Sequence, residues 1–453
     1  MTRQACAVAR LTAGWDDAGH GISLHDHHRR YGELPSSRGR AIGGRDLIDQ
    51  VAAAGLTGRG GAGFPTGAKM QAVAGRRGPA ALIANGMESE PASEKDKALL
   101  TRAPHLVLDG IELAARAIGA TTVCLCLPQR RRKLIAIVTE AVRQRQQART
   151  GAVPVEIREL TGGYVASEET ALVHWLNGGM AKPTATPPRP FERGVGKRPT
   201  MVANVETLAH VALIARHGAA WFRQTGVAEA PGTMLTTVTG AVARPGIYEI
   251  AGGTRTGDLL AAAQAQSGVE AVLVGGYFGT WHPVGQVTGL PFTKPGLSRA
   301  GAAPGAGVLF ALQPGTCGLA EAARILRYLA DESARQCGPC MFGLPAIASD
   351  LSQLAARHPQ GDPLDRLQRR FRQIAGRGAC RHPDGAVRMA ESALTAFAAD
   401  ARAHSRGGLC LAADSVSRDG LCLPGRALSP GAGSVPRGRA LSPGLALSPG
   451  HHP

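Results

Sequence analysis

Short apolar blocks and helical periodicities alternate along the first half of the chain. Apolar runs at residues 80–84 and 121–127 predict two buried parallel strands, and residues 153–157 predict a third. Residues 106–118 carry apolar side chains at helical spacing between the first two strands, and another helix is expected to begin near Asp46. This order predicts β-α-β units and therefore an α/β fold with a parallel sheet.

The pattern changes in the second half of the chain. Segments 234–240, 246–250 and 272–276 predict strands separated by Gly and Pro turns, with one helix at 256–265. Helical spacing then returns at 318–333 and, as a last amphipathic helix, at 386–401. We therefore expect a small β-rich domain followed by a helical domain.

The two ends of the chain carry neither pattern. The N-terminal segment is polar and His-rich, which favours a solvated, mobile arm over a histidine metal site. Near the C-terminus the sequence Ala-Leu-Ser-Pro-Gly recurs, and such a short repeat cannot bury a core. The predicted organisation is an arm at 1–40, an α/β domain at 41–230, a β-rich domain at 231–295, a helical domain at 310–403 and a disordered tail at 404–453.

Composition narrows the class of protein. The chain has 453 residues, 44% of them hydrophobic, which is enough for several small cores and excludes full disorder. It contains no run of about 18 apolar residues and no apolar signal segment, so we expect an intracellular protein without membrane insertion. Its nine cysteines are then expected to be thiols or metal ligands rather than disulfides.

The net charge of +17 has two interpretations. An Arg bias in a Gly- and Ala-rich chain explains it as well as an anionic partner does. Aromatic residues make up only 4% of the chain, too few to stack bases along a groove, and no nucleic-acid recognition motif is present. We therefore expect no nucleic-acid partner.

A dense glycine loop at residues 55–69 is the first chemical motif. Its G-x-G-x-x-G spacing lacks the preceding strand of a dinucleotide-binding motif, and Lys69 does not stand where a Walker A lysine would. Glycines let backbone amides approach a phosphate closely, and Arg59 and Lys69 add positive charge. The loop favours a phosphate site, with a plain flexible turn as the alternative.

Two acidic motifs follow. Asn85, Glu88 and Glu90 come directly after the first predicted strand, at the edge where open α/β sheets bind ligands. Glu168 and Glu169 stand together where a helix is expected to begin, which suits its positive end. An exposed acidic turn and a plain helix cap are the respective alternatives.

Three cysteines form the fourth motif. Cys337 and Cys340 are spaced C-x-x-C, and Cys380 follows them. Three such thiolates are typical of iron–sulfur sites, whereas zinc needs a fourth soft ligand and a thioredoxin-like pair would follow a strand. Of the other cysteines, Cys124 and Cys126 are expected in the core, while no role is assigned to Cys6, Cys410 and Cys422.

Taken in this order, the four motifs resemble the NADH-oxidising flavoprotein subunit of respiratory complex I. The same family includes the diaphorase subunits of NAD-reducing hydrogenases and formate dehydrogenases. Residues 201–208, with Asn204 and Thr207, resemble a fifth family motif, V-N-N-V-E-T-L. The resemblance spans roughly residues 40–402 and implies a Rossmann-like parallel-sheet flavin domain, then a β-grasp domain, then a C-terminal helical bundle carrying the iron–sulfur site.

The resemblance also implies an activity: hydride transfer from NADH to FMN, then single-electron steps to a [4Fe–4S] cluster. It assigns Glu90 and Glu169 to the NADH side and Cys337, Cys340 and Cys380 to the cluster. The residues that it assigns to cofactor binding are Gly58, Arg59, Gly60, Gly61, Phe64, Lys69, Asn85, Glu88, Tyr164, Glu168, Asn204 and Thr207. The implied partner is a ferredoxin-like or thioredoxin-fold Fe–S subunit near the C-x-x-C, and the implied location is cytoplasmic, at the periphery of a membrane complex.

The chain departs from the family pattern at several nucleotide-side positions. Met87 replaces an Asp, Met70 a Trp, and Ala72 a second aromatic residue, while Thr186 and Arg189 replace a Lys and a Phe. Rings are what grip a planar base, so a donor other than NADH is one alternative. A degenerate member that serves as a scaffold or binding module is the other.

The cluster motif departs as well. Ala334 stands where the family has the first cysteine of C-x-x-C-x-x-C, so one iron needs another ligand. The candidates are Cys317, Ser333, His382 and solvent, and a lost cluster with residual thiols is the alternative.

Overall fold

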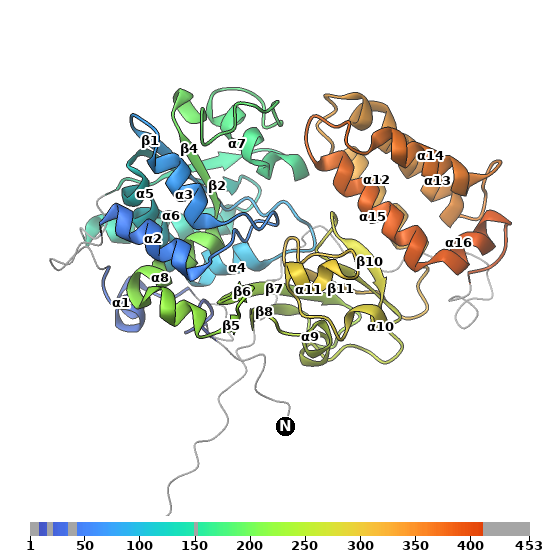
Figure 1. Ribbon diagram of the computed structural model, residues 1–453, viewed down its shortest axis with the longest axis horizontal. Coiled ribbons are helices and arrows are strands. Elements are labelled where there is room, and N and C mark those ends of the chain that lie inside the picture. Colours follow the sequence, from blue (N-terminus) through green and yellow to red (C-terminus); the bar gives the residue numbers. More distant parts are fainter. Residues whose placement is uncertain (1–8, 16–20, 35–42, 149–152, 411–453) are drawn as a thin grey trace, which may run out of the picture.

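A four-stranded parallel sheet forms the centre of the first structural region (Figure 1). The computed structural model describes residues 9–15, 21–34, 43–148 and 153–410. Cys6, Cys422, most of the predicted tail and part of the predicted arm lie outside these residues. The strands are β1 (Ala80–Asn85), β2 (Ala120–Pro128), β3 (Glu156–Leu160) and β4 (Thr200–Asn204), and their order is β3-β2-β1-β4.

The parallel sheet was predicted, although β3 begins at Glu156, three residues later than expected. β1 pairs with β2 on one side and with β4 on the other, so the direction of chain crossover reverses at β1. Such a reversal opens a crevice at the carboxyl ends of the strands. The helices of this region are α2 (Gly44–Ala54), α3 (Thr66–Ala74), α4 (Lys95–Arg102), α5 (Pro104–Ile118), α6 (Arg132–Gln147), α7 (Glu169–Leu176) and α8 (Val205–Arg223), with short turns at Tyr164–Ser167 and Val195–Lys197.

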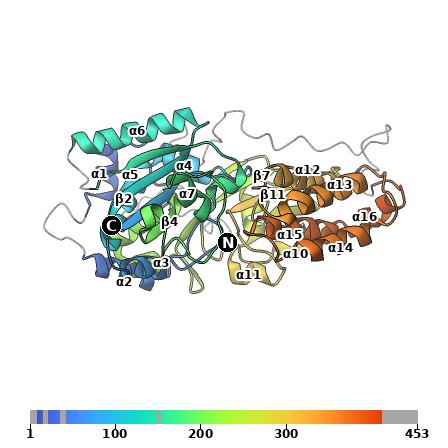
Figure 2. The ribbon, with the colours of Figure 1, turned by 90° about the horizontal axis from the view of Figure 1, so that it is seen from above.

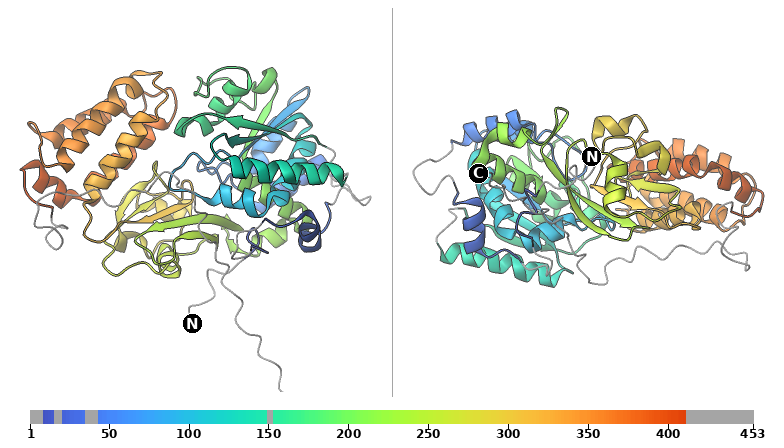
Figure 3. Two further views of the ribbon diagram at one scale, coloured as in Figure 1. Left: turned by 180° about the vertical axis from the view of Figure 1, so that it is seen from behind. Right: turned by 90° about the horizontal axis from the view of Figure 1, so that it is seen from below.

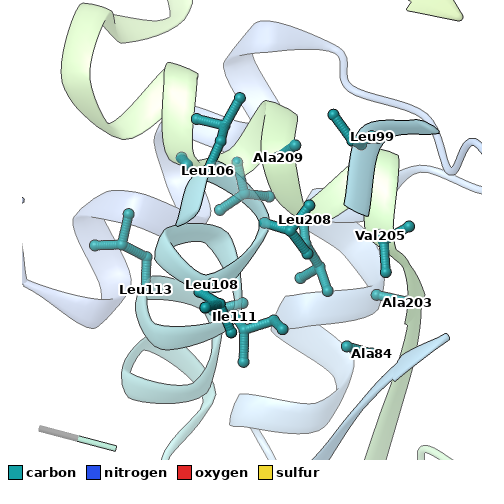
Figure 4. Close-up of a cluster of buried hydrophobic side chains, with 14 of the residues drawn as sticks. Ala84, Leu99, Leu106, Leu108, Ile111, Leu113, Ala203, Val205, Leu208 and Ala209 are labelled. Carbon is teal, nitrogen blue, oxygen red and sulfur yellow. The ribbon is translucent and has the colours of Figure 1, made fainter. Parts of the chain in front are cut away.

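Both faces of the sheet are buried along β1, β4 and most of β2, which explains why these strands are nearly continuous apolar runs, whereas the edge strand β3 is largely polar and only partly buried. On one face Leu82 and Ala84 belong to the main core, together with α5 and α8 (Figure 4). On the other face Ile83 packs in a smaller core with Cys126 and Leu172. The expectation that Cys126 is a core residue is therefore confirmed.

α5 and α8 approach each other unusually closely at Gly110. A Cβ added to Gly110 would lie 1.8 Å from the carbonyl oxygen of Leu208. Around this contact Leu106, Ile111 and Leu208 fill the space between the two helices (Figure 4). The missing side chain is thus what allows the main core to close.

The N-terminal segment is anchored where a mobile arm was expected. Helix α1 (Leu24–Tyr31) buries His27, whose Nε2 lies 2.7 Å from an Asp109 carboxylate oxygen on α5. Although burial opposes its ionisation, the hydrogen bond from His27 and the charges of Arg216 and Arg145 hold the pKa of Asp109 well below its ordinary value. The pattern missed this anchor because the partners of His27 are far away in the sequence.

A mixed five-stranded sheet forms the second region, in the order β10-β9-β11-β7-β8. Its strands are β7 (Thr233–Gly240), β8 (Gly246–Ala251), β9 (Ala271–Val274), β10 (Thr280–Pro283) and β11 (Val308–Ala311); β5 (Gly226–Val227) and β6 (Ala230–Pro231) form a separate hairpin. β7 and β11 pair in parallel, and the other neighbours are antiparallel. The helices are α9 (Thr256–Ala262), α10 (Val284–Val287) and α11 (Lys294–Ser298). The sheet agrees with the expected β-grasp class, but β10 and the central β11 were not predicted.

Helices alone make up the third region: α12 (Gly318–Asp331), α13 (Leu344–Ala355), α14 (Pro363–Ile374), α15 (His382–Ala396) and α16 (Ala398–Ser405), with a π-helical turn at Pro339–Gly343. The predicted helix at 386–401 is two helices, because Phe397 leaves helical geometry at φ −110° and ψ 35°. The β-rich region lies between the other two along the longest axis (Figures 1 and 2), and the views from behind and below agree (Figure 3). In the part of the chain that the structure describes, no helix is both long and apolar enough to span a membrane.

Candidate functional site

The crevice at the carboxyl ends of β1 and β4 brings two predicted site residues together. Asn85 and Asn204 are the last residues of these adjacent strands and are paired in register. The Asn204 side chain accepts a hydrogen bond from Glu206 N and so caps α8, while Asn85 Nδ2 donates to the Ser167 carbonyl at 2.9 Å. Three of the motifs therefore meet where the sheet reverses direction.

The glycine loop lies over the same edge of the sheet. The Arg59 backbone N–H donates to Thr207 Oγ1 at 2.8 Å, which ties the loop to the first turn of α8. A Cβ on Gly60 would lie 3.5 Å from Asn204 Cβ, while Gly61 and Gly63 have φ of 106° and 66°, which side chains rarely tolerate. As expected, a helix rather than a strand precedes the loop.

Lys69 and Glu169 form an ion pair across two motifs. Lys69 Nζ lies 3.0 Å from Glu169 Oε2, and both side chains are partly exposed. Glu168 caps α7, accepting hydrogen bonds from Thr170 N and Ala171 N, and burial raises its pKa. The predicted helix start at the paired glutamates is confirmed, and the partly exposed Glu169 is the one that pairs with Lys69.

Glu90 lies where the second and third motifs meet the β-rich region. Its Oε2 accepts hydrogen bonds from the Tyr164 hydroxyl at 2.8 Å and from Tyr277 N at 2.9 Å. Burial raises the pKa of Glu90 to about 7. The carboxyl group therefore changes its protonation state near neutral pH.

Glu88 is directed towards α4. Its backbone has a φ of 39°, and its carboxylate accepts hydrogen bonds from Asp96 N at 2.8 Å and Lys97 N at 2.9 Å. Burial and the neighbouring Asp96 charge raise the pKa of Glu88 to about 7. These bonds occupy both carboxylate oxygens, so Glu88 shapes the site by holding the start of α4.

A buried ionic network beneath the crevice was missed at the sequence level. Lys95 Nζ lies 2.6 Å from Asp96 and 2.9 Å from Glu206, and Asn204 Nδ2 donates to Asp96 at 2.6 Å. Although burial opposes its ionisation, the Lys95 charge lowers the pKa of Glu206 to about 2. The only sign of this network in the sequence was Glu206, the acidic residue inside the motif at 201–208. Lys95, which neutralises Glu206, lies in a different segment, on α4.

The three predicted cluster cysteines converge at the end of α12. Burial and the neighbouring thiols of Cys337 and Cys380 raise the pKa of Cys340 to about 12. Arg335, in the turn that leads to Cys337, has a φ of 54°. A tight turn thus presents the C-x-x-C thiols to Cys380.

The structure separates the candidates for a fourth ligand. Cys317 precedes α12, whereas the other cysteines follow it, and the 14 residues of this helix place its ends about 20 Å apart. Cys317 was therefore a wrong candidate.

Ser333 Oγ and His382 Nδ1 are both buried and, among the described residues, have no hydrogen-bond partner. His382 Nε2 lies 2.7 Å from the Leu329 carbonyl oxygen, which leaves the lone pair on Nδ1.

Tyr164 connects the crevice to the cysteines. Its backbone N–H donates to Glu332 Oε2 at 2.8 Å, and its ring lies 5.8 Å from that of His382. A Cβ on the preceding Gly163 would lie 1.6 Å from the same Glu332 oxygen, so a larger residue there would displace this carboxylate. The two predicted cofactor sites are therefore neighbours, since residues of one touch residues of the other.

A further cluster has no counterpart among the predicted sites. Cys317, His404 and Cys410 are all buried and bring their ligand atoms within 4.8 Å of one another. No spacing rule identified it, because Cys317 is distant in sequence from His404 and Cys410, and Cys410 stands where a tail was expected.

Sequence comparisons match both halves of this arrangement. The profile described as "Nuo51 FMN-binding domain" matches residues 51–213, and that described as "NADH-ubiquinone oxidoreductase-F iron-sulfur binding region" matches residues 320–404. An F-type NADH-quinone oxidoreductase subunit of Rhizobium meliloti (strain 1021) is 31% identical over 85% of this chain and 94% of its own length. The F-type counterpart from Streptomyces coelicolor is 32% identical over 88% of this chain and 92% of its own.

Solved structures of an NAD+-reducing [NiFe]-hydrogenase are similar as well. The H2-reduced form has a TM-score of 0.76 and 33% identity, covering 80% of this chain and 62% of the hydrogenase chain. The air-oxidised form has a TM-score of 0.78 and 31% identity, covering 88% of this chain and 67% of that chain. This chain thus spans about two thirds of the hydrogenase chain, and nearly all of the two relatives named above.

Proposed function

The chain belongs to the family of F-type NADH-quinone oxidoreductase subunits, and we propose that its crevice binds FMN and NADH while its three cysteines hold the iron–sulfur cluster. The family assignment makes it an oxidoreductase flavoprotein subunit with FMN and a [4Fe–4S] cluster as cofactors. The placement of each cofactor on individual residues is our proposal. The observation that carries it is the convergence of the motifs at Asn85 and Asn204.

The crevice fits a flavin phosphate. The glycine loop leaves backbone unshielded, since a Cβ on Gly63 would meet nothing within 4 Å. The Arg59 guanidinium is directed inward, since its Nη atoms donate to Thr57 Oγ1 and to the Thr233 carbonyl and its Nε lies 4.0 Å from Glu206 Oε1. Lys69 therefore supplies the cation at the rim. Backbone amides and a cation are groups that bind phosphate.

Several residues of the chain are arranged to bind and orient a nicotinamide donor. Phe64 is 57% exposed beside the loop and offers a ring to a planar base, so this chain keeps one ring of the motif although it lacks those at Met70 and Ala72. The Glu90 carboxyl has a pKa of about 7, so it can donate a hydrogen bond when protonated and only accepts hydrogen bonds when ionised. When bound, FMN accepts a hydride and releases electrons one at a time.

The cysteine site fits an iron–sulfur cluster with one atypical ligand. Cys337, Cys340 and Cys380 supply three thiolates, and the buried Ser333 Oγ and His382 Nδ1 are donors without another partner in the described residues. Metal ligands need such an unshared donor atom. We propose that one of these two side chains takes the place of the cysteine lost at Ala334.

The surface beside the cysteines suits a partner. Met341 and Phe342 are 50% and 72% exposed, and Arg327 and Arg335 line a depression next to Cys340. Exposed apolar side chains flanked by cations favour an acidic partner. We propose that a ferredoxin-like or thioredoxin-fold Fe–S subunit docks here, and that the chain is a cytoplasmic subunit at the periphery of a membrane complex. The names of its relatives support its being one subunit of an NADH-quinone oxidoreductase.

Anaerobic purification of the full chain tests the proposal. We expect a yellow protein that releases FMN on denaturation, whose visible spectrum bleaches with NADH, and whose reduced form gives an iron–sulfur EPR signal. Lys69→Ala should weaken FMN binding about tenfold, corresponding to about 1.4 kcal/mol. Lys133→Ala, on the exposed face of α6, is the matched control and should bind FMN normally.

Two results would count against this proposal. A chain that takes up no FMN even when it is added, with no NADH-dependent dye reduction, supports the scaffold alternative. Flavin that is bleached by dithionite but not by NADH supports a different donor.

A further inference from the structure

Cys317, His404 and Cys410 form a second group of metal-ligating side chains, far from the cluster cysteines. All three are buried, and their ligand atoms lie within 4.8 Å of one another. Cys317 is the residue before α12, His404 lies in the last turn of α16, and Cys410 follows that helix. The 14 residues of α12 separate this group from the C-x-x-C by about 20 Å, so it serves no role in the iron–sulfur site.

The histidine is already oriented as a metal ligand. His404 Nδ1 lies 3.2 Å from the Leu354 carbonyl oxygen on α13, where it donates its proton. In this tautomer the lone pair is on Nε2. Histidines that bind metals commonly donate their other ring N–H to a carbonyl, which fixes the ring.

The two thiols face each other in the same pocket. The Cys317 and Cys410 sulfurs lie within 4.8 Å of each other and of a His404 ring nitrogen. Asp400, which is also buried, precedes His404 by one helical turn and so lies on the same face of α16. Two sulfurs, one imidazole and a nearby carboxylate are therefore brought together by three separate segments of chain.

We propose that Cys317, His404 and Cys410 bind a zinc ion, with Asp400 or a water molecule in the fourth position. Two thiolates and an imidazole are the donor set that zinc prefers, whereas magnesium and calcium take oxygen ligands. A tetrahedral site with Zn–S bonds of about 2.3 Å spaces its ligand atoms about 3.7 Å apart. The observed group therefore has only to contract slightly. Binding replaces the two thiol protons, which pass to solvent, and involves no change of oxidation state.

The site has a structural consequence for the helical region. It ties Cys410, the last residue that the structure describes, to the start of α12 through α16. The bond network closes the end of the bundle opposite the cluster cysteines. This zinc is expected to stabilise the region without taking part in electron transfer.

Metal analysis of the full-length holoprotein, together with variants, tests this proposal. We expect about one zinc per chain in the wild type, as for a structural site with closed ligation. Cys410→Ser and His404→Ala should each lower the zinc content at least about tenfold. Cys124→Ser removes another buried thiol, in β2, and should retain full zinc. The iron and FMN contents of every variant should match the wild type, which also shows that the variants fold.

A cobalt titration gives a measurement that requires no variant. After chelation of zinc, Co2+ added to the wild type should give an intense thiolate charge-transfer absorption and tetrahedral d–d bands. Two results would overturn the proposal: absence of both zinc and the cobalt spectrum, or a Cys317–Cys410 disulfide found by peptide mapping of the anaerobically purified protein. Loss of zinc from Cys124→Ser to the same extent as from Cys410→Ser would equally overturn it.

Discussion

Glu90 illustrates how the surroundings of a single residue set its chemistry. It is one of two carboxylates in the same short motif, of which Glu90 is buried and Glu88 is half-buried, and both have a pKa of about 7. Yet Glu88 is bound to the backbone of α4, while Glu90 contacts Tyr164 and Tyr277 at the meeting point of two regions. The same residue type therefore caps a helix at one position and lines the proposed nucleotide side at the other.

The raised pKa of Glu90 predicts a pH-dependent stability. The carboxyl titrates at about 7 in the folded protein, but at about 4.3 in an unfolded chain. Between these values the folded protein binds more protons than the unfolded chain, so its free energy of unfolding falls as the pH rises. Glu90→Gln removes the titrating group and therefore this loss. The free energy of unfolding of the variant relative to that of the wild type should be on the order of 2 kcal/mol more favourable at pH 8 than at pH 5.

Urea unfolding of wild type and Glu90→Gln at the two pH values measures the effect. Glu229→Gln, at an exposed turn between β5 and β6, is the control and should show no such difference. If Glu90→Gln followed the wild type at both pH values, the buried carboxyl would not be the origin of the pH dependence.

Because Ala334 replaces a cluster cysteine of the family, we predict that one iron of the proposed cluster is labile. Ala334 is buried at the position of the missing family cysteine, so Ala334→Cys should supply a fourth thiolate. We expect the variant to lose iron about tenfold more slowly than the wild type during mild oxidation, because changes around a metal's ligands alter metal affinity by about this factor. Iron analysis and EPR during ferricyanide treatment measure this. Ala330→Cys, on α12 beside the same depression, is the control; equal iron loss in all three proteins would contradict the prediction.

At the scale of elements, the contact between α5 and α8 decides whether the main core can close. The apolar face of α5 was readily predicted from its spacing, and the helix begins within two residues of the expected position. Which helix covers it was not predictable, because α8 is more than eighty residues away in the sequence. Gly110 is the point where the two backbones nearly touch.

Gly110→Ala should therefore be strongly destabilising. The new Cβ would lie 1.8 Å from the Leu208 carbonyl oxygen, and since backbone cannot rotate away, we expect a loss of at least about 3 kcal/mol in the free energy of unfolding. Gly285→Ala, in α10, meets nothing within 4 Å, so it should be neutral or gain up to about 1 kcal/mol. Urea denaturation compares the two; a Gly110→Ala protein as stable as the wild type would show that the helices can separate at no cost.

At the scale of the whole molecule, Tyr164 joins all three regions. Its hydroxyl binds Glu90 in the α/β region, its ring packs 4.8 Å from Phe278 of the β-rich region, and its backbone binds Glu332 at the end of α12. Electron transfer between two cofactors depends on a fixed separation. These contacts hold the proposed flavin crevice and the cysteines in one arrangement.

Glu332→Ala tests this docking. It leaves the Tyr164 N–H without its acceptor, at a cost of about 1–3 kcal/mol, which should loosen the contact between the regions. We expect flavin reduction by NADH at the wild-type rate but slower reduction of the cluster, followed by stopped-flow absorbance and freeze-quench EPR. Glu332→Gln keeps an acceptor oxygen and should restore the rate. Identical cluster reduction in Glu332→Ala and wild type would mean that other contacts suffice.

The net charge also gains a more specific meaning at this scale. From the sequence alone, the net charge of +17 was compatible either with an Arg bias in the composition or with an anionic partner. Arg327 and Arg335 now lie beside the cluster cysteines and two exposed apolar side chains. Part of the charge is therefore located where the proposed electron-transfer partner would bind.

The sequence by itself determined the fold class, the order of the three regions and the identity of the family. Continuous apolar runs encode the buried strands, and motifs such as the glycine loop and the paired Glu168 and Glu169 carry their chemistry in adjacent residues. Such signals are local, so they can be read without knowing the fold. The parallel sheet, the helix before the loop and the core position of Cys126 followed from them.

Only the tertiary structure decided which distant residues share an environment. It directed Glu88 to α4, removed Cys317 from the cluster, buried His27 against Asp109 and placed β11 at the centre of its sheet. It also brought Cys410 from the apparent tail to His404. The reason is physical: burial, hydrogen bonding and ligand geometry are properties of space, and the packing of whole elements brings these groups together whatever their separation along the chain.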